Sequence, residues 1–408
     1  MSARGNGLVA TPPAAEYIRT HQARAADPFD RDRNPDGYVA LCTAENKLVA
    51  DLVLARLGAV DDVPARALGY DAMVGAEGVR EKIAGFMART FVGRPVDARH
   101  LALLAGAGAV LESLFYAICD PGDGVLVPTP SYAGFWADLE TRDDLNIIPV
   151  HCSSEAGFRL TPDLLDRALT EASRPVRALL FTSPNNPLGW VYDADEIDEI
   201  INWAERRGVH VVFDEVYALS VYGDRPFVSA AKRRAPLGER IHVAWAFSKD
   251  FGASGLRAGV LLSENEAVLR AVDGLAYWSA VSGHTQHLLG EMVADDAWVD
   301  GYIAELQIRL RAAAGRIVAA LDEIGVPHVP ADAGIFVLCD MRTFMTEVSW
   351  AAEDALWREI LEKANVNLTP GSACHVGEPG WLRLCFAAVA TDTAVAGIRR
   401  IGDALRRR

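Results

Sequence analysis

The chain has 408 residues, of which half are hydrophobic and 23% are charged, as in an ordinary folded protein and unlike a disordered one. Its 40 basic and 55 acidic side chains give a net charge of −15. This charge argues against a general nucleic-acid binder, which needs a basic face. At roughly 150 residues per domain, the length predicts two or three domains.

The longest apolar stretch, residues 101–118, contains Glu112 and Ser113, so we expect no membrane-spanning segment. The N-terminus lacks the apolar core of a secretory signal, and none of the six cysteines form a Cys-x-x-Cys pair. We therefore expect a cytoplasmic protein with reduced thiols and no metal site. Only five of the 40 basic residues are lysines, which is typical of a GC-rich genome and leaves few candidates for amine chemistry.

Taken in chain order, residues 1–40 are rich in turn formers and are predicted to be irregular. From about residue 75, helical and strand patterns alternate. Buried strands are expected at 124–129, 178–182, 209–214 and 241–247, with a helix over 193–207. Alternating strands and helices predict a mostly parallel α/β sheet, and ligands of such sheets bind at the carboxyl ends of the strands.

A long helical pattern over residues 296–325 leads into a second region, which carries a strand at 334–340, a helix at 350–364 and a strand at 381–386. This mixture predicts a smaller α+β domain. We expect residues 1–45 to join that small domain, residues 46–290 to form a large domain and residues 291–408 to form the small one.

Polar side chains follow three of the predicted strands. Lys249 follows the strand at 241–247, where its amine suits Schiff-base chemistry with pyridoxal phosphate (PLP). Asp214 ends the strand at 209–214 and Tyr217 follows three residues later; they suit the ring nitrogen and O3′ of that cofactor, respectively. Asn186, in the turn at 183–189, can donate to O3′. Each residue alone would equally suit a loop or a turn, and the combination indicates PLP.

Three further features fit the same cofactor. Ala107 and Gly108 precede a helix whose backbone N–H groups can bind a phosphate. Tyr132 follows the strand at 124–129 and can stack on a ring. Arg383 can hold a substrate carboxylate through two hydrogen bonds.

In this order, the motifs resemble those of the fold type I PLP-dependent enzymes, in the class I and II aminotransferase group. The chain looks most like 1-aminocyclopropane-1-carboxylate (ACC) synthases. The resemblance covers nearly the whole chain and includes Ser-Pro-Asn-Asn-Pro-Leu-Gly at 183–189, Asp-Glu-Val-Tyr at 214–217, Ser-Lys-Asp at 248–250 and Pro-Gly-Ser-Ala-Cys-His at 370–375. It implies an α/β fold, with a seven-stranded, mostly parallel sheet in the large domain.

The resemblance also implies a homodimeric enzyme and roles for individual residues. The resemblance assigns catalytic roles to Lys249, Asp214 and Tyr217. It assigns further cofactor-binding roles to Ala107, Gly108, Tyr132, Asn186, Arg257 and Tyr70, of which Tyr70 would reach the phosphate of the neighbouring subunit. It assigns substrate-binding roles to Arg383, Glu45, Cys42 and Thr43. The chain departs from the family where Ala107-Gly108 and Ala246 replace hydroxyl donors to the phosphate, and where Cys42-Thr43 replaces a Gly-Leu pair.

We therefore expect transformation of an α-amino acid through a Cα carbanion, by aminotransfer or by β/γ-elimination or replacement, in specialised bacterial metabolism. An S-adenosylmethionine-using enzyme with γ-carbon chemistry, including ACC synthase itself, is the first alternative. A decarboxylating or C–S-cleaving PLP enzyme is the second. A non-catalytic PLP sensor fused to a DNA-binding domain is not expected, because such a domain needs a basic recognition helix.

Overall fold

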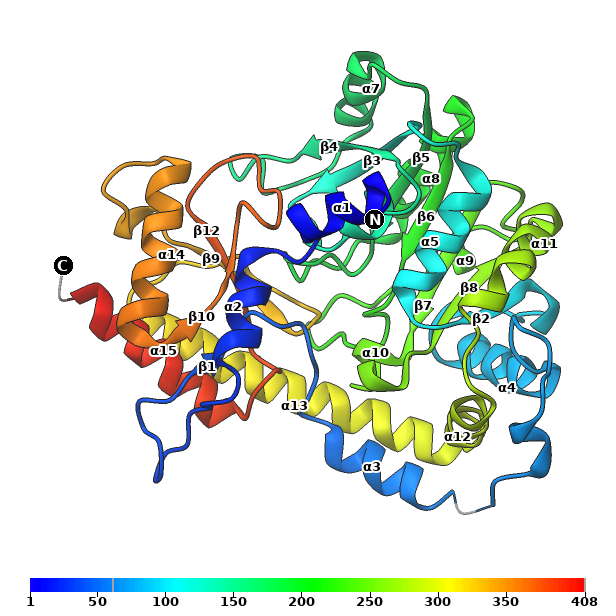
Figure 1. Ribbon diagram of the computed structural model, residues 1–408, viewed down its shortest axis with the longest axis horizontal. Helices are drawn as coiled ribbons and strands as arrows, with labels where there is room; N and C mark the ends of the chain where they lie inside the picture. Colours follow the sequence, from blue (N-terminus) through cyan, green and yellow to red (C-terminus); the bar gives the residue numbers. More distant parts are fainter. Residues whose placement is uncertain (61, 407–408) are drawn as a thin grey trace.

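A seven-stranded sheet forms the centre of the larger part of the computed structural model, which describes residues 1–60 and 62–406 (Figure 1). Its strands, in spatial order, are β2 (Leu101–Leu104), β8 (Gly259–Ser263), β7 (Ile241–Ala246), β6 (His210–Asp214), β5 (Val176–Thr182), β3 (Gly124–Thr129) and β4 (Asn146–His151). Strand β8 is antiparallel to both of its neighbours, and every other pair is parallel. The predicted mostly parallel sheet is confirmed.

Helices cover both faces of this sheet. Successive strand residues point to opposite sides, and apolar residues on both sides must be buried. In β3, Leu126 packs in one core cluster with Ile197 of α8 (Ala194–Arg207). Its neighbour Val127 packs in another cluster with residues of α5 (Ala107–Ile118) and α11 (Glu266–Leu275). The remaining helices of this part are α3 (Ala50–Gly58), α4 (Glu77–Met87), α6 (Phe135–Glu140), α7 (Pro162–Glu171), α9 (Ala230–Arg233), α10 (Phe247–Asp250) and α12 (Gly283–Val293).

Helix α8 shows how local sequence sets the ends of an element. Asp193 accepts hydrogen bonds from the backbone of Asp195 and Glu196, and the Glu196 side chain accepts one from the Asp193 backbone, which together form a capping box. Gly208 ends the helix in the left-handed region with φ 68°. The helix predicted at 193–207 is therefore confirmed.

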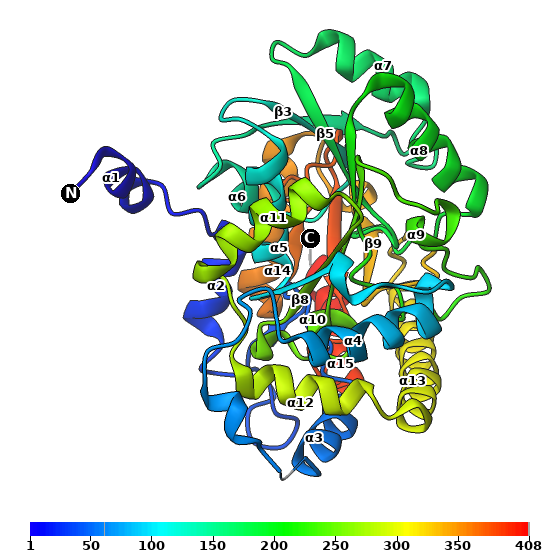
Figure 2. The same cartoon turned by 90° about the vertical axis from the view of Figure 1, so that its right-hand side faces the viewer.

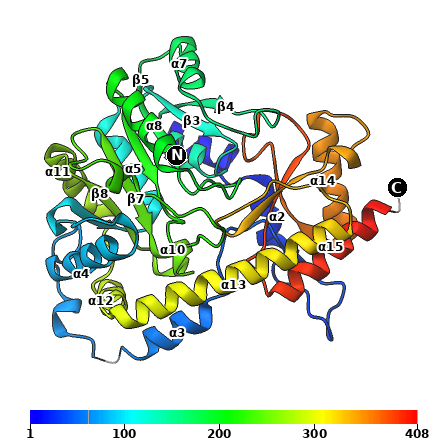
Figure 3. The same ribbon diagram turned by 180° about the vertical axis from the view of Figure 1, so that it is seen from behind.

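The long helix α13 (Asp296–Glu323) runs from beside α12 to the smaller part of the molecule (Figure 3). That part holds an antiparallel sheet of β11 (Thr369–Pro370), β12 (Trp381–Cys385) and β9 (Phe336–Asp340), together with α14 (Trp350–Ala364) and α15 (Thr391–Arg406). Strand β1 (Val39–Ala40) pairs with β10 (Val366–Asn367), so the N-terminal segment lies against this part. The domain boundaries themselves stay a prediction, and residues 407–408 lie outside the described residues.

The expectation that residues 1–40 are irregular is wrong. They contain α1 (Ala3–Ala10) and α2 (Glu16–Arg24), with Pro12 and Pro13 between the two helices. Helix α2 is held from a distance, because Glu16 pairs with Arg358 of α14 at 2.7 Å. Helix α1 buries no side chain and stands out from the body of the molecule (Figure 2). None of the helices in the described part of the chain has the length and apolar character needed to cross a membrane.

Candidate active site

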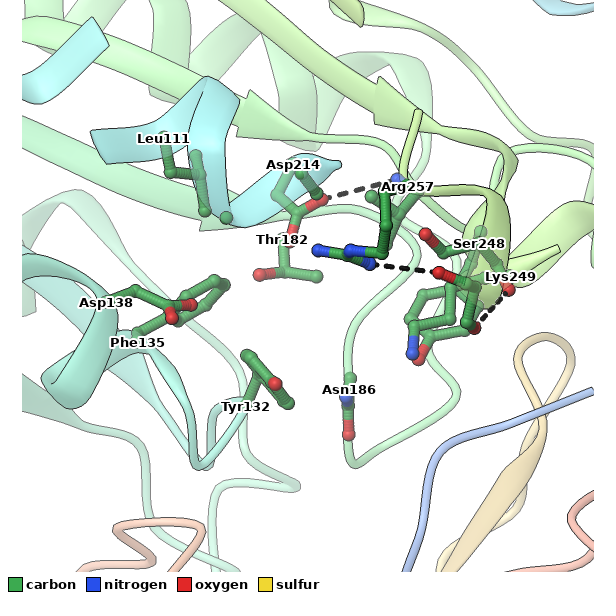
Figure 4. A pocket seen from close by; sticks show the side chains of 15 residues that line it. Leu111, Tyr132, Phe135, Asp138, Thr182, Asn186, Asp214, Ser248, Lys249 and Arg257 are labelled. Atoms are coloured by element: carbon green, nitrogen blue, oxygen red, sulfur yellow. Dashed lines mark hydrogen bonds between the residues drawn. The ribbon is translucent and has the colours of Figure 1, made fainter. Parts of the chain in front are cut away.

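One pocket lies at the carboxyl ends of β5, β6 and β7, where the sequence places its polar residues (Figure 4). It is lined by eight of the predicted site residues: Ala107, Gly108, Tyr132, Asn186, Asp214, Tyr217, Lys249 and Arg257. The fold therefore brings together side chains that are more than 140 residues apart in the sequence, at the edge of the sheet where the carboxyl ends of parallel strands meet.

Lys249 lies in α10, which begins directly after β7. Its Nζ donates to the backbone oxygen of Ala44 at 2.5 Å. The surrounding protein keeps water away from the amine and lowers its pKa. A lowered pKa raises the fraction of neutral amine, which is the form that acts as a nucleophile or a base.

Asp214 and Tyr217 are buried polar residues with almost no protein partners. The Asp214 carboxylate accepts one hydrogen bond, from the Val216 backbone at 3.3 Å, and burial raises its pKa to about 7. The Tyr217 hydroxyl has no hydrogen-bond partner among the described residues, and burial raises its pKa. Buried polar groups are normally paired, so this part of the pocket is built for a polar ligand.

Arg383 lies in β12, is 2% exposed and contacts the pocket through Asn186. Its guanidinium donates to Asn186 Oδ1 at 3.1 Å, to the Cys42 backbone oxygen at 2.8 Å and to Thr369 Oγ1 at 3.0 Å. Its Nε has no acceptor, and no carboxylate pairs with it among the described residues. Because Asn186 turns its oxygen toward Arg383, its amide N–H₂ is left to donate elsewhere.

The N-terminus of α5 and Arg257 form one end of the pocket. Gly106 precedes this helix with φ 92°, and a Cβ there would lie 2.5 Å from a nitrogen of the Arg257 guanidinium. Glycine is therefore required for the arginine to reach the first turn of the helix. Arg257 is fixed by donating to the backbone oxygens of Ser254 at 3.0 Å and Ala105 at 3.3 Å. A helix N-terminus beside an arginine is suited to an anion.

Sequence reasoning missed several residues that also line this pocket. Thr182 is the last residue of β5, so its place at the carboxyl end of a strand could have identified it. Ser248 directly precedes Lys249. Asp138 and Ser254 do not directly follow a strand: Asp138 lies on α6 and Ser254 in the turn before Arg257, and no sequence pattern pointed to either.

Five predicted residues do not line this pocket: Arg383, which contacts it through Asn186, and Cys42, Thr43, Glu45 and Tyr70. Cys42 reaches the site through its backbone oxygen, while its thiol lies 3.8 Å from the Tyr38 hydroxyl. Thr43 and Glu45 lie on the same segment, on either side of the carbonyl that contacts the lysine, and Glu45 pairs with Lys47 at 3.3 Å. Tyr70 is 98% exposed. Within residues 1–60 and 62–406, no group of three or more His, Cys, Asp or Glu could hold a metal ion.

Comparisons with known proteins identify the family of this chain. The family model described as aminotransferase class I and II matches residues 62–401. Curated relatives include 1-aminocyclopropane-1-carboxylate synthase 4 of Oryza sativa subsp. japonica, 35% identical over 94% of this chain and 86% of its own length. Another is 1-aminocyclopropane-1-carboxylate synthase 6 of Arabidopsis thaliana, 32% identical over 95% of this chain and 82% of its own length.

Solved structures show the same fold at lower identity. The aspartate aminotransferase from Thermus thermophilus with maleate matches with a TM-score of 0.81 at 21% identity, covering 99% of each chain. The aromatic aminotransferase from Pyrococcus horikoshii OT3 matches with a TM-score of 0.79 at 21% identity, covering 91% of this chain and 96% of its own. The chain belongs to the class I and II aminotransferase family, whose members are PLP-dependent enzymes. It is an enzyme of the aminotransferase and lyase type with Cα-carbanion chemistry, and its curated relatives include ACC synthases.

Proposed function

We propose that this chain binds PLP through Lys249 and transforms an α-amino acid. The observation that carries the proposal is the set of buried polar atoms without protein partners around the lysine: Tyr217 Oη, Arg383 Nε and the nearly unpartnered Asp214 carboxylate. These groups fit PLP and an amino acid together. The pyridinium N–H of PLP would donate to the Asp214 carboxylate, and its phenolic oxygen would accept from the Tyr217 hydroxyl. The substrate carboxylate would pair with the Arg383 guanidinium.

Each residue has a defined task in this proposal. PLP, when bound, supplies the electron sink for the charge that develops at the substrate's Cα. Asp214 holds the proton at the ring nitrogen, while Tyr217 and the Asn186 amide donate to O3′. Tyr132 stacks on the ring. The Lys249 amine would take the Cα proton, and its lowered pKa favours the neutral form that can do so.

Arg383 binds the substrate carboxylate and so orients the bonds at Cα. It is suited to this task because it is a buried cation without an ion-pair partner among the described residues. Burying an unpaired charge is costly, and a carboxylate would remove that cost. Cys42, Thr43 and Glu45 lie on the segment beside Lys249 and Arg383, where they would contact the remainder of the substrate.

We also propose a homodimer in which Tyr70 reaches the partner's phosphate site. An aromatic side chain that is 98% exposed, on a segment away from its own pocket, supports an interface there. Mixing Tyr70→Phe and Lys249→Ala subunits should restore activity, because one site of each mixed dimer keeps both residues. Full activity of a monomer would contradict the shared site. The domain division at residues 45 and 290 is proposed with this assembly, supported by the β1–β10 pairing.

The fate of the Cα carbanion decides the reaction, and we propose aminotransfer or β/γ-elimination or replacement. S-adenosylmethionine with γ-carbon chemistry is the second candidate, because the curated relatives at 32–35% identity are named ACC synthases. Decarboxylation is the third. The role in specialised bacterial metabolism remains a proposal resting on composition.

The test is to add S-adenosylmethionine, and separately a panel of α-amino acids, to the PLP-loaded protein and to identify products by mass spectrometry. A pyridoxamine form of the cofactor with a keto acid marks aminotransfer. Release of methylthioadenosine marks γ-carbon chemistry, and carbon dioxide marks decarboxylation. Reaction of amines without a carboxylate, with every α-amino acid inert, would contradict the role of Arg383 and the proposed substrate class.

A further inference from the structure

Asp138 lines the pocket at the end formed by α5 and Arg257, and no motif identified it (Figure 4). It projects from α6, one turn after Phe135. Its Oδ1 would lie 3.9 Å from a Cβ at Gly108, so the carboxylate faces the first turn of α5. An acid therefore stands beside the helix N-terminus that would bind the PLP phosphate.

The Asp138 carboxylate accepts no hydrogen bond from the described residues. Burial raises its pKa to about 6, and the Arg257 guanidinium partly opposes this rise. The charged and titratable groups that face Asp138 in the pocket are Arg257, Asp214 and Tyr132. Asp138 also lines a second, adjoining pocket, whose charged groups are Glu112 and Arg142. These two pair with each other at 3.2 Å, which leaves Arg257 as the nearby cation free to serve an anion in the pocket.

A phosphate ester carries up to two negative charges near neutral pH and needs hydrogen-bond donors. Two hydroxyl donors common in this family are absent here, at residues 107–108 and at Ala246. An ionised Asp138 would repel the phosphate, whereas a protonated Asp138 would supply a donor at the same end of the pocket. The approach of the phosphate favours the protonated form, because a second negative charge raises the pKa of the first group.

We propose that Asp138 takes up a proton from solvent when the PLP phosphate binds and then donates a hydrogen bond to a phosphate oxygen. This inference rests on the proposed binding of PLP. The sign of the pH effect follows from the two states. The pKa of Asp138 is higher with the phosphate bound, so the contribution of Asp138 to PLP affinity is most favourable at low pH and weakens as the pH rises above about 6. This effect of Asp138 lowers the PLP affinity by at most about tenfold per pH unit.

The test compares wild type with Asp138→Asn, which keeps the shape and a donor but cannot ionise, and compares PLP with pyridoxal, which lacks the phosphate. At about pH 8.5, Asp138→Asn should bind PLP at least about tenfold more tightly than wild type, while at about pH 5.5 the two should agree. Pyridoxal affinity should be the same for both proteins. Since the phosphate and ring of PLP titrate in both proteins, their contributions cancel in this comparison.

A matched control is Glu112→Gln, which removes the acid of the adjoining pocket and should leave the PLP affinity unchanged. Calorimetry of PLP binding to the wild-type chain, in buffers of different ionisation enthalpy, should show greater proton uptake than in Asp138→Asn. That measurement does not depend on the stability of a variant at extreme pH.

Two results would overturn the inference. One is an Asp138→Asn variant that binds PLP more weakly by the same factor at both pH values, which would mean that the carboxylate only positions Arg257. The other is an equal change in pyridoxal affinity, which would place its effect away from the phosphate. A wild-type chain that binds neither PLP nor pyridoxal would instead overturn the proposed function itself.

Discussion

Two buried acids lie near the reacting lysine, and their surroundings differ. Asp250 is 0% exposed, and its carboxylate accepts from Ser220 Oγ at 2.7 Å, Trp245 Nε1 at 2.9 Å and the Leu219 backbone at 3.1 Å. Asp214 is 5% exposed and accepts from one backbone N–H at 3.3 Å. A satisfied buried carboxylate serves the fold, whereas an unsatisfied one serves a ligand.

The same contrast, between polar groups with and without protein partners, separates the hydrogen-bond network around Asp250 from the pocket. The Asp250 network ties the loop after Tyr217 to β7, and Tyr302 of α13 donates to the Asp250 backbone oxygen at 2.7 Å. It therefore fixes the segment that carries Lys249. Tyr217 in the pocket and Arg383 beside it both keep unpartnered polar atoms. Substitutions in the two regions should separate into effects on stability and effects on ligands.

The largest expected effect is that of Arg383→Lys on catalysis. Losing the two-pronged hydrogen bonding of a buried charged pair costs about 2–5 kcal/mol, so kcat/KM for the amino-acid substrate should fall by about 100-fold, with PLP content unchanged. The matched control is Arg342→Lys on the same part of the molecule. Arg342 already pairs with Asp340 at 2.6 Å, so kcat/KM should stay the same. Equal losses in both variants would contradict the role of Arg383.

The next effect is that of Asp250→Asn on stability. The amide oxygen can replace Oδ2 as the acceptor for Trp245 and Leu219, but it accepts more weakly than a carboxylate, and the amide N–H₂ then forces the Ser220 hydroxyl to accept instead of donate. Weakening these buried hydrogen bonds costs about 1–3 kcal/mol. We expect the free energy of unfolding of the PLP-free protein, measured with denaturant, to fall by this amount. Asp214→Asn removes a carboxylate with one long hydrogen bond and should not lower it. If both variants are equally destabilised, the contrast between the two acids is wrong.

The smallest expected effect is that of Tyr217→Phe on the stability of the PLP-free protein. Its hydroxyl has no partner among the described residues, so its removal should change the free energy of unfolding by less than about 0.5 kcal/mol. With PLP bound, the pH titration of the cofactor's visible absorbance should move to higher pH, because a donor to an anionic O3′ is lost. An unchanged titration would show that the hydroxyl does not contact O3′.

The sequence predicted the part of the site that follows simple rules of strands. Asp214, Asn186 and Lys249 all follow buried strands of a parallel sheet, and the carboxyl ends of such strands meet at one edge. The buried strands expected at 124–129 and 241–247 were predicted from their continuous apolar runs, and the structure has strands at Gly124–Thr129 and Ile241–Ala246.

Other features could not be predicted, because they depend on contacts between distant residues. Helix α2 is held by ion pairs to a helix more than 300 residues away in the sequence. The turn formers in residues 1–40 predicted irregular structure there, because such distant contacts leave no local pattern. Asp138 enters the site through the placement of α6 against α5, and Arg257 reaches Gly106 only in the folded chain. The roles of Tyr70 and Glu45, which line no part of the pocket, stay predictions.

The central claim is that the unpartnered polar groups surround Lys249 because PLP is attached there. The direct measurement is reduction of the PLP-loaded protein with borohydride, followed by proteolysis and mass spectrometry. With only five lysines in the chain, each candidate peptide can be examined separately. We expect the reduced cofactor on the peptide that contains Lys249 and on no other. Cofactor on a peptide with another lysine, or on none, would contradict it.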